Sequence, residues 1–294
     1  MEAKQWSVSK TLISVWLTIF SLAMLVPILN IFAKAFSDPD KVRLMKGYDI
    51  WPKGFSFVHF KVVFSNPLVT TALSNSLFIT VVGTIASVFF TTLCAYVLTR
   101  KNLVGKTPLM IFLIIVMIFE PGIIQEYMVV KDLGLLDSLW SIVLYRMINV
   151  YYLIIMMRFI EEIPESLVEA ARIDGAGHMK LFMRIVLPLA RIPVLTITLF
   201  YAVAKWNEFF KSSIFLSSRD KTVLQVLLRQ FVVERDSTSF VSASNLLANN
   251  SIAQLDFSAI KAATIVVAMV PILLLYPIIL KYFTKGVMDG GVKE

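Results

Sequence analysis

Residues 62–99 form the stretch that decides the fold class. They read VVFSNPLVTTALSNSLFITVVGTIASVFFTTLCAYVLT, without a single aspartate, glutamate, lysine or arginine. The hydrocarbon core of a bilayer takes about 20 predominantly apolar residues in one helix. This stretch is therefore long enough for one tilted membrane helix with a leading segment, and we expect the helix over residues 70–98.

The composition of the whole chain agrees with a membrane protein. Of its 294 residues, 57% are apolar and 16% are charged, and the mean hydropathy is +0.77. Soluble domains are about 45–50% apolar and about 25% charged, and disorder needs low hydrophobicity. A single cysteine excludes a disulfide framework. The net charge of +8 is typical of basic cytoplasmic loops, so we expect no nucleic-acid partner.

Apolar stretches on both sides extend the pattern to six predicted spans. Their approximate ranges are residues 11–33, 70–98, 107–130, 138–157, 185–216 and 262–280. Polar or helix-breaking residues interrupt three of them, namely Glu120, Pro121, Gly122 and Glu126 in the third, Arg146 in the fourth and Lys205 in the fifth. We therefore predict an all-α polytopic membrane protein, with residues 1–294 in one transmembrane domain.

The distribution of basic residues predicts the orientation. Lysine and arginine gather in the loop at 99–107, in the loop before the fifth span and in the tail. With six spans these regions share one side with the N-terminus, and the positive-inside rule assigns that side to the cytoplasm. Residues 37–66 and 217–260 then form external loops. Although Ala33-Lys34-Ala35 fits a cleavage site, the first span exceeds the about 7–15 apolar residues of a signal peptide, so we expect an uncleaved anchor.

Motifs for catalysis and nucleotide binding are missing from the sequence. Gly105-Lys106-Thr107 resembles the end of a phosphate-binding loop, but Arg100 stands where that pattern needs a glycine. His59 and His178 are the only histidines, and neither belongs to a zinc-hydrolase motif. We therefore predict no catalytic residue, no metal ligand and no cofactor in this chain.

The segment at residues 164–178 predicts a short helix with a defined start. It reads PESLVEAARIDGAGH. Pro164 suits a first helical turn. Ser166 and Glu169 have the spacing of a capping box, in which each side chain binds a backbone N–H of the other's residue.

The same segment has a defined end and a shallow face. Gly175 and Gly177 permit the positive φ values that end a helix. One side at helical spacing is formed by Leu167, Ala170, Ala171 and Asp174. The two alanines let another backbone approach this side closely. Residue physics alone is equally consistent with an ordinary amphipathic loop helix in which Glu169 serves only as a cap.

The spacing within and after this segment resembles a known signature. Glu169-Ala170-Ala171, then Gly175, then Ile185-x-Leu187-Pro188 resemble the EAA motif of permease subunits of ATP-binding-cassette (ABC) importers. Further stretches resemble the sugar-importer branch, namely Arg158-Phe159, Ile163-Pro164, Ile173-Asp174-Gly175-Ala176 and Trp206-Asn207-Glu208-Phe209. Length, predicted spans and the tail at 285–293 are similar to the smaller permease of the maltose type, in the branch for oligosaccharides and heteropolysaccharides.

This resemblance implies a machine in the bacterial cytoplasmic membrane. Two permease subunits form the path, two ATPase subunits supply ATP and Mg chemistry, and an extracytoplasmic binding protein delivers a carbohydrate. The segment at 164–178 would be a cytoplasmic coupling helix docked in a groove of the ATPase, with both chain termini also cytoplasmic. The implied coupling residues are Glu169, Ala170, Ala171, Asp174, Gly175, Ala176 and Gly177. Glu169 would pair with a basic residue of the ATPase.

Polar residues inside the predicted spans are candidates for the translocation path. At about 1.5 Å per residue they fall in the outer half of the bilayer, and ionisable residues in spans usually face a cavity or a partner. We therefore expect a polar vestibule formed by Glu120, Arg146, Lys205, Trp206, Asn207 and Glu208. The alternative is pairing that only holds helices together, such as Lys205 with Glu208.

Two other functions stay open at this point. The same kind of importer would carry a different solute, such as a polyol phosphate. A self-contained secondary transporter or channel would need no ATPase. Such transporters often contain an internal repeat with paired broken helices, and the two halves of this chain show no convincing repeat.

Overall fold

The computed structural model describes residues 8–101, 103–233 and 256–290. Every regular element in these ranges is helical, which confirms the predicted all-α class. The predicted external loop at 217–260 and the tail lie partly outside the described residues. The chain divides into two compact units, residues 1–70 with 228–271 and residues 71–227 with 272–294. Each unit is described by itself.

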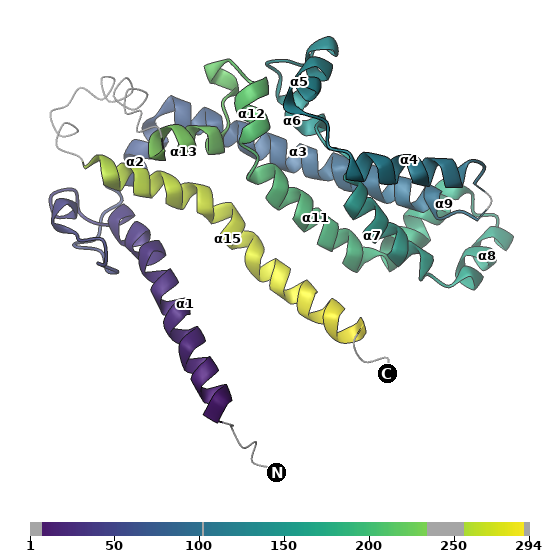
Figure 1. Cartoon of the computed structure of the whole chain (residues 1–294), viewed down its shortest axis with the longest axis horizontal. Helices are drawn as coiled ribbons and strands as arrows, with labels where there is room; N and C mark the ends of the chain where they lie inside the picture. Colours follow the sequence, from purple (N-terminus) through teal and green to yellow (C-terminus); the bar gives the residue numbers. More distant parts are fainter. Residues whose placement is uncertain (1–7, 102, 234–255, 291–294) are drawn as a thin grey trace. The chain divides into compact units, whose positions relative to one another are not determined.

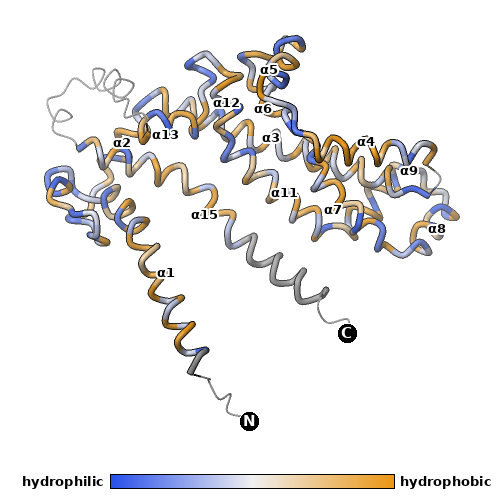
Figure 2. The backbone as a smooth tube through the Cα atoms, viewed as in Figure 1, coloured by the Kyte–Doolittle hydropathy of each residue, from blue (hydrophilic) through white to orange (hydrophobic). Residues whose placement is uncertain are grey.

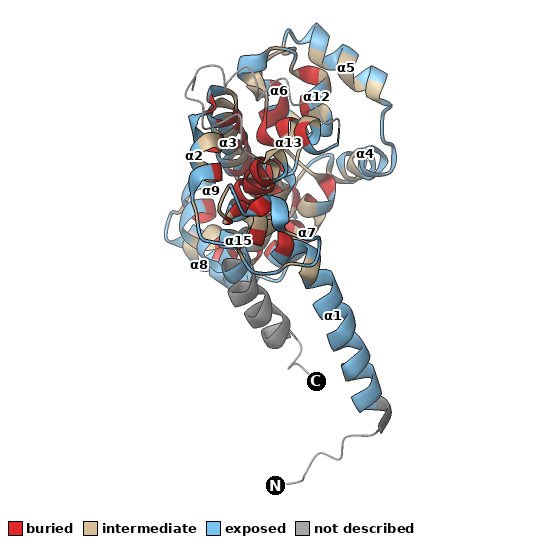
Figure 3. Ribbon diagram, turned by 90° about the vertical axis from the view of Figure 1, so that its left-hand side faces the viewer, coloured by how far each residue is buried: buried red, intermediate tan, exposed pale blue. Residues whose placement is uncertain are grey.

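The unit built on residues 71–227 carries the candidate site. Its elements, which Figure 1 labels, are α3 (Pro67–Leu98), α4 (Lys106–Ile118), α5 (Ile123–Asp132), α6 (Leu139–Leu144), α7 (Val150–Glu161), α8 (Glu165–Ile173), α9 (His178–Leu181), a π-helical turn (Phe182–Val186), α10 (Leu187–Leu189), α11 (Arg191–Trp206), α12 (Phe210–Phe215) and a 3-10 turn (Arg219–Lys221). Within this unit α8 lies at one end, and α5, α6 and α12 lie toward the other (Figures 1 and 3).

The other unit contains α1 (Val8–Ala35), a 3-10 turn (Val42–Leu44), α2 (Val58–Ser65), most of α13 (Leu224–Val232) and the first part of α15 (Phe257–Gly290). The predicted external loop at 37–66 is folded onto the end of α1. Asn30 Nδ2 donates hydrogen bonds to the carbonyl oxygens of Lys46 and Asp49, at 2.9 and 2.7 Å. An aromatic cluster also joins the loop to Phe36: the Phe36 and Phe55 rings are stacked, and Phe57 and Phe60 contact them edge-on or at a tilt.

Three described helices are long and apolar enough to cross a membrane. They are residues 10–35 of α1, the whole of α3 and residues 257–277 of α15, which confirms the first, second and sixth predicted spans as helices. Two bent helix pairs raise the number to five if each pair is one span. The fourth predicted span is neither one of these long apolar helices nor one of the two bent pairs, so the count of six stays a prediction.

The third predicted span is broken where its sequence is interrupted. α4 ends at Ile118, α5 begins at Ile123, and their axes differ by 119°. Pro121 has no N–H to donate and its ring opposes a continuing helix, so the break falls where the proline and Gly122 stand. Glu126, in contrast, lies inside α5.

The fourth and fifth predicted spans are also not single helices, and this corrects the ranges 138–157 and 185–216. The fourth consists of α6 and α7 with a break at residues 145–149. The fifth bends by 83° between residues 178–189 and α11, at Ala190, and ends at Trp206 before the separate α12. Pro188 and Pro193 flank the bend and remove backbone donors on both sides.

Buried apolar residues of this unit form two clusters, and α4 contributes none of them. One apolar cluster joins the end of α3 with α7, α8, α9 and α11, and a second joins α3, α6 and α12 around Ile79, Ile142 and Phe215. Figure 3 draws buried residues in red. α4 is hydrophobic along most of its length (Figure 2) and has no buried residue, as expected of a helix that faces lipid or another subunit.

Candidate functional site

The predicted coupling segment forms a helix, but it does not begin with the predicted capping box. α8 runs over Glu165–Ile173, and Pro164 occupies the N-cap position without a side-chain hydrogen bond. The predicted Ser166–Glu169 capping box is therefore wrong. With Ser166 as its cap the helix would begin at Leu167, but after Pro164, whose φ is fixed, it begins two residues earlier, at Glu165. The Glu169 side chain is exposed.

The end of α8 is a Schellman motif built around Gly175. Ala176 N–H donates to the Ala171 carbonyl at 2.9 Å, and Gly175 N–H donates to the Arg172 carbonyl at 3.0 Å. Gly175 has a φ of +77°, a value that side chains with a Cβ adopt only with strain. Gly177 has a φ of −68° and serves as N-cap of α9. The prediction of positive φ is thus confirmed for Gly175 and wrong for Gly177.

α8 is anchored by one side chain and presents the rest to its surroundings. Val168 is its only buried residue, and it packs in the apolar cluster that also contains Leu181, Val186 and Tyr201. Ile173 is 86% exposed, and Glu169, Ala170 and Asp174 are also exposed. A helix that keeps an isoleucine open to solvent has a surface that is suited to a partner.

A charged groove lies beside α8. It has a volume of about 1130 Å³ and is lined by the loop at 99–106 together with α8 and the turn that follows it. Lys101 forms an ion pair with Glu165 across it. Arg100 lies over the Tyr96 ring, 4.0 Å from its centre. The loop at 99–106 and α8 therefore meet at the same end of this unit.

The candidate path residues make several different contacts within this unit. Arg146 Nη2 donates to Glu120 Oε1 at 2.8 Å, so the breaks of the third and fourth predicted spans are joined by an ion pair with exposed side chains. Trp206 is buried, with 2% exposure, and does not offer its ring to a ligand within this unit. Asn207 Nδ2 donates to the Val203 carbonyl at 3.0 Å.

Lys205 does not pair with Glu208 in an ion pair and is largely enclosed. Its Nζ donates three hydrogen bonds to carbonyl oxygens in α6 and the following break, those of Ile142 at 2.8 Å, Val143 at 3.1 Å and Tyr145 at 2.8 Å. Glu208 instead accepts the backbone N–H of Lys211 at 2.7 Å. The alternative pairing of Lys205 with Glu208 is therefore not formed, because helix-end carbonyls already use the ammonium donors.

A second polar cluster joins α5, the α6–α7 break and α12. Lys211 forms an ion pair with Glu126, and both side chains are mostly buried. Tyr145 donates its hydroxyl hydrogen to Glu126 at 3.2 Å, and Lys211 Nζ lies 5.3 Å from the centre of the Tyr145 ring. Sequence spacing did not connect Glu126 with Lys211, because 85 residues separate them.

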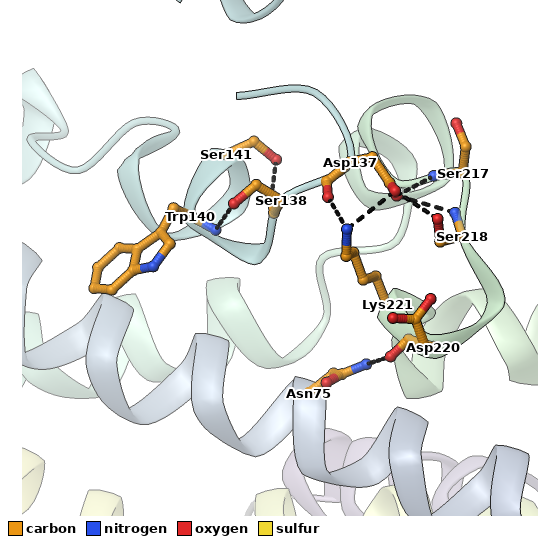
Figure 4. A network of polar contacts seen from close by, with 9 residues as sticks. All are labelled: Asn75, Asp137, Ser138, Trp140, Ser141, Ser217, Ser218, Asp220 and Lys221. Atoms are coloured by element: carbon orange, nitrogen blue, oxygen red, sulfur yellow. Dashed lines mark hydrogen bonds and ion pairs between the residues drawn. The ribbon is translucent and has the colours of Figure 1, made fainter. Parts of the chain in front are cut away.

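The loop before α6 and the loop after α12 are joined by Asp137 (Figure 4). Its Oδ1 accepts the backbone N–H groups of Ser217 and Ser218, both at 3.0 Å, and Lys221 Nζ lies 3.1 Å from Oδ2. These contacts, led by the Ser218 hydroxyl, hold the pKa of the Asp137 carboxyl well below its usual range. Asn75 of α3 donates to the carbonyls of Asp220 and Thr222, at 2.8 and 2.9 Å.

Sequence reasoning missed Asp137 and Tyr201. Asp137 follows Gly134 in a turn, which marks a loop but no partner. Tyr201 lies one helical turn before Lys205, and this spacing is the only sequence signal that both residues contact the same neighbouring segment. Within the parts of the chain that the structure describes, no group of three histidine, cysteine, aspartate or glutamate side chains is placed to hold a metal ion.

Comparisons with known proteins agree on one family. Residues 103–289 match the family described as binding-protein-dependent transport system inner membrane component. The chain is 39% identical to the polygalacturonan/rhamnogalacturonan transport system permease protein YtcP of Bacillus subtilis (strain 168), over 95% of this chain and 96% of the relative. It is 38% identical to protein LplC of the same organism, over 92% of this chain and 89% of the relative.

A solved structure extends this agreement to the fold. A chain from a bacterial ABC transporter involved in the import of the acidic polysaccharide alginate matches with a TM-score of 0.85 and 30% identity, over 96% of this chain and 100% of that chain. The family match covers the coupling segment and every break described above. The chain therefore belongs to the family of inner membrane components of binding-protein-dependent transport systems.

Proposed function

We propose that the chain forms half of the translocation path of an ATP-driven carbohydrate importer and is coupled to the ATPase through α8. The observation that carries this proposal is an exposed helix held by a single buried side chain, Val168. Its partners are a second permease, two ATPase subunits and a binding protein outside the membrane. The ATP and Mg belong to the ATPase subunits, and α8 faces the cytoplasm together with both termini.

The chemistry of α8 supports a docking role. Glu169 and Ala170 are exposed on the helix, so a carboxylate is available to a basic partner while the small side chain allows close approach. Ile173, 86% exposed, adds an apolar contact that a partner would remove from water. The Schellman turn at Gly175 fixes the angle between α8 and the chain that leads to α11.

The cargo we propose is an oligosaccharide that carries carboxylates. Two similarities support it, since one relative is a polygalacturonan/rhamnogalacturonan permease and the matched structure is from an importer of an acidic polysaccharide. No observation favours a polyol phosphate. Membership of a binding-protein-dependent family argues against a self-contained transporter or channel.

Two variants of α8 test the coupling. Glu169→Lys reverses the charge proposed to meet the ATPase, and Gly175→Asp introduces a side chain where φ is +77°. We expect both complexes to insert in the membrane. We expect the rate of ATP hydrolysis stimulated by the loaded binding protein to fall about tenfold or more in both. Glu162→Lys is the matched control, because it makes the same charge reversal at an exposed residue just before α8. Normal stimulated hydrolysis in both α8 variants would sink the proposal.

The cargo is tested on the cognate binding protein by calorimetric titration. Trigalacturonate, maltotriose and glycerol 3-phosphate represent the acidic sugar, the neutral sugar and the polyol phosphate. We expect the acidic sugar to bind at least about tenfold more tightly than the other two, since a bidentate arginine–carboxylate contact contributes this much. Preferential binding of maltotriose would contradict the proposed acidic cargo and leave the proposed importer function unchanged.

A further inference from the structure

The break in the fourth predicted span is held at both ends by one helix, α11. On one side of the break the carbonyls of Ile142, Val143 and Tyr145 accept hydrogen bonds from Lys205. On the other side the Asn149 N–H donates to the Tyr201 hydroxyl at 2.9 Å. Carbonyls at the end of a helix have no partner within it, and a break at membrane depth needs other groups to satisfy them. Two side chains of α11 supply those groups.

The Lys205 contact leaves the ammonium no free donor. An ammonium has three N–H donors, and three carbonyl oxygens use them. The residue is only 9% exposed, and its stem lies against Gly83 of α3, where an added Cβ would be 3.3 Å from Lys205 Cδ and Cε. Lys205 is therefore built to bind the end of α6 and is not presented to a passing sugar.

The Tyr201 contact is equally specific. Its hydroxyl is paired with Thr91 Oγ1 at 2.7 Å and accepts the Asn149 N–H. Asn149 is in turn the N-cap of α7, since its Oδ1 accepts the N–H of Tyr151 at 2.9 Å. Tyr201 and Lys205 are four residues apart and so lie on the same face of α11. A shift of α11 along or about its axis acts on both ends of the break together.

Two further contacts connect the break to its surroundings. Tyr201 and Val168 of α8 belong to one buried apolar cluster, so α8 and the middle of α11 share one packed core. Within the break, Arg146 adopts a φ of 47° and pairs with Glu120 at 2.8 Å, in the break between α4 and α5. The contacts thus run without a gap from α8 to both breaks.

We propose that Tyr201 and Lys205 are positioning residues that carry a movement of α11 to the break in the fourth span and, through Arg146 and Glu120, to the break in the third. The two breaks are then the parts of this subunit that rearrange when the ATPases close. This inference rests on the proposed coupling through α8. It assigns Lys205 to transmission and leaves contact with the cargo to other residues.

The experiment measures the distance between the two breaks in the assembled importer. Nitroxide labels are placed at Ile118→Cys, at the end of α4, and Met147→Cys, in the break between α6 and α7, with the native Cys94 replaced by serine. Pulsed electron paramagnetic resonance is recorded without nucleotide and with Mg-ATP and vanadate. We expect the distance to change with nucleotide in the otherwise unaltered complex. If the distance does not change in this complex, which retains Tyr201 and Lys205, the proposal is overturned.

Two variants then test the residues themselves. Lys205→Met keeps the length of the stem and removes all three donors, and Tyr201→Phe removes only the hydroxyl. We expect both to lose most of the distance change and to lower substrate-stimulated ATP hydrolysis by about tenfold, as expected for loss of a hydrogen bond to a charged group or a buried amide. Thr91→Val is the control, because it removes one partner of Tyr201 and keeps the Asn149 contact.

The outcomes separate this inference from the proposed function. A full distance change in Lys205→Met and Tyr201→Phe overturns the inference, even where Gly175→Asp uncouples hydrolysis and so supports coupling through α8. An equal loss in Thr91→Val also overturns it, since it would show a general effect of disturbing Tyr201. Normal stimulated ATP hydrolysis in the α8 variants Glu169→Lys and Gly175→Asp would instead contradict the proposed function.

Discussion

Within the residues that the structure describes, two that are not glycine adopt left-handed backbone conformations, and charged contacts hold both. Asp137 has a φ of 53° and Arg146 a φ of 47°. This region costs an L-residue about 1–2 kcal/mol, and aspartate adopts it more readily than arginine. Backbone and hydroxyl groups of Ser218 bind the Asp137 carboxylate, and Glu120 binds the Arg146 guanidinium. Each conformation therefore depends on contacts with another loop.

Replacement of Asp137 by asparagine tests the charge without disturbing the backbone. Asparagine also tolerates the left-handed region, but it is neutral and does not attract Lys221. We expect Asp137→Asn to lower the temperature of thermal unfolding in detergent at neutral pH. Asp220→Asn removes the same charge from the loop that Asp137 contacts and leaves the Asp137 carboxylate in place, so it is the matched control. An equal effect of both variants would contradict a specific role of Asp137.

The pH dependence of this difference follows from the lowered pKa of Asp137. A carboxyl whose pKa is lower in the folded than in the unfolded protein stabilises the fold above the unfolded pKa, and this contribution is lost as pH falls through the folded pKa. The difference in unfolding temperature between wild type and Asp137→Asn should therefore stay constant from about pH 7 to 5 and shrink below about pH 4. A difference that disappears near pH 6 would contradict this assignment.

At the scale of elements, the long apolar helices could be predicted from the sequence and the breaks only in part. Pro121 and Gly122 mark the break between α4 and α5, because a proline opposes helix continuation. Nothing comparable marks the break at Arg146, where the only local signal is Asn149, a favoured cap residue. Its other support comes from Lys205, 60 residues away from Tyr145.

The site shows the same limit. Ionisable residues inside membrane spans are rare and face either a cavity or a partner. Lys205 could be selected from the sequence on this ground, but the sequence does not show which of the two surrounds it. The partner consists of backbone carbonyls, which no side-chain pattern reveals. The ends of α8 were predictable to different degrees, because the turn at Gly175 depends on local φ, whereas a proline at the N-cap displaced the expected capping box.

Gly83 in α3 allows helix stability to be separated from the Lys205 contact. Alanine in a helix interior is favoured over glycine by about 1 kcal/mol, but a Cβ here would lie 3.3 Å from Lys205 Cδ and Cε. We expect Gly83→Ala to retain the thermal stability of wild type and to reduce the nucleotide-dependent distance change between the two breaks. Gly47→Ala, where an added Cβ meets nothing within 4 Å, should change neither. A full distance change in Gly83→Ala would show that the packing of Lys205 against α3 is dispensable.

At the scale of the whole molecule, polar contacts group the loops at two ends of one unit. Asn75, at the start of α3, contacts residues 220 and 222, which Asp137 also joins through Lys221. At the other end of α3, Lys101 pairs with Glu165 of α8. α3 carries the chain about 36 Å between these ends at about 1.5 Å per residue, which matches a bilayer core of about 30 Å. The chain passes between them three more times, by α4–α5, by α6–α7 and by α9–α12.

These contacts favour four crossings, by α3, α4–α5, α6–α7 and α9–α12, and with α1 and α15, counted from their hydropathy, we predict six spans. We test this by labelling single cysteines in a Cys94→Ser chain with an impermeant maleimide on intact cells. Arg219→Cys should react from outside, whereas Lys10→Cys and Arg172→Cys should react only after the membrane is opened. If α4–α5 were re-entrant, the passes would number five, and Arg172 and Lys10 would label from opposite sides. The loop at 99–106 follows α1 and α3 and therefore shares the side of Lys10, so that result would put the membrane between this loop and α8 and would contradict the Lys101–Glu165 ion pair.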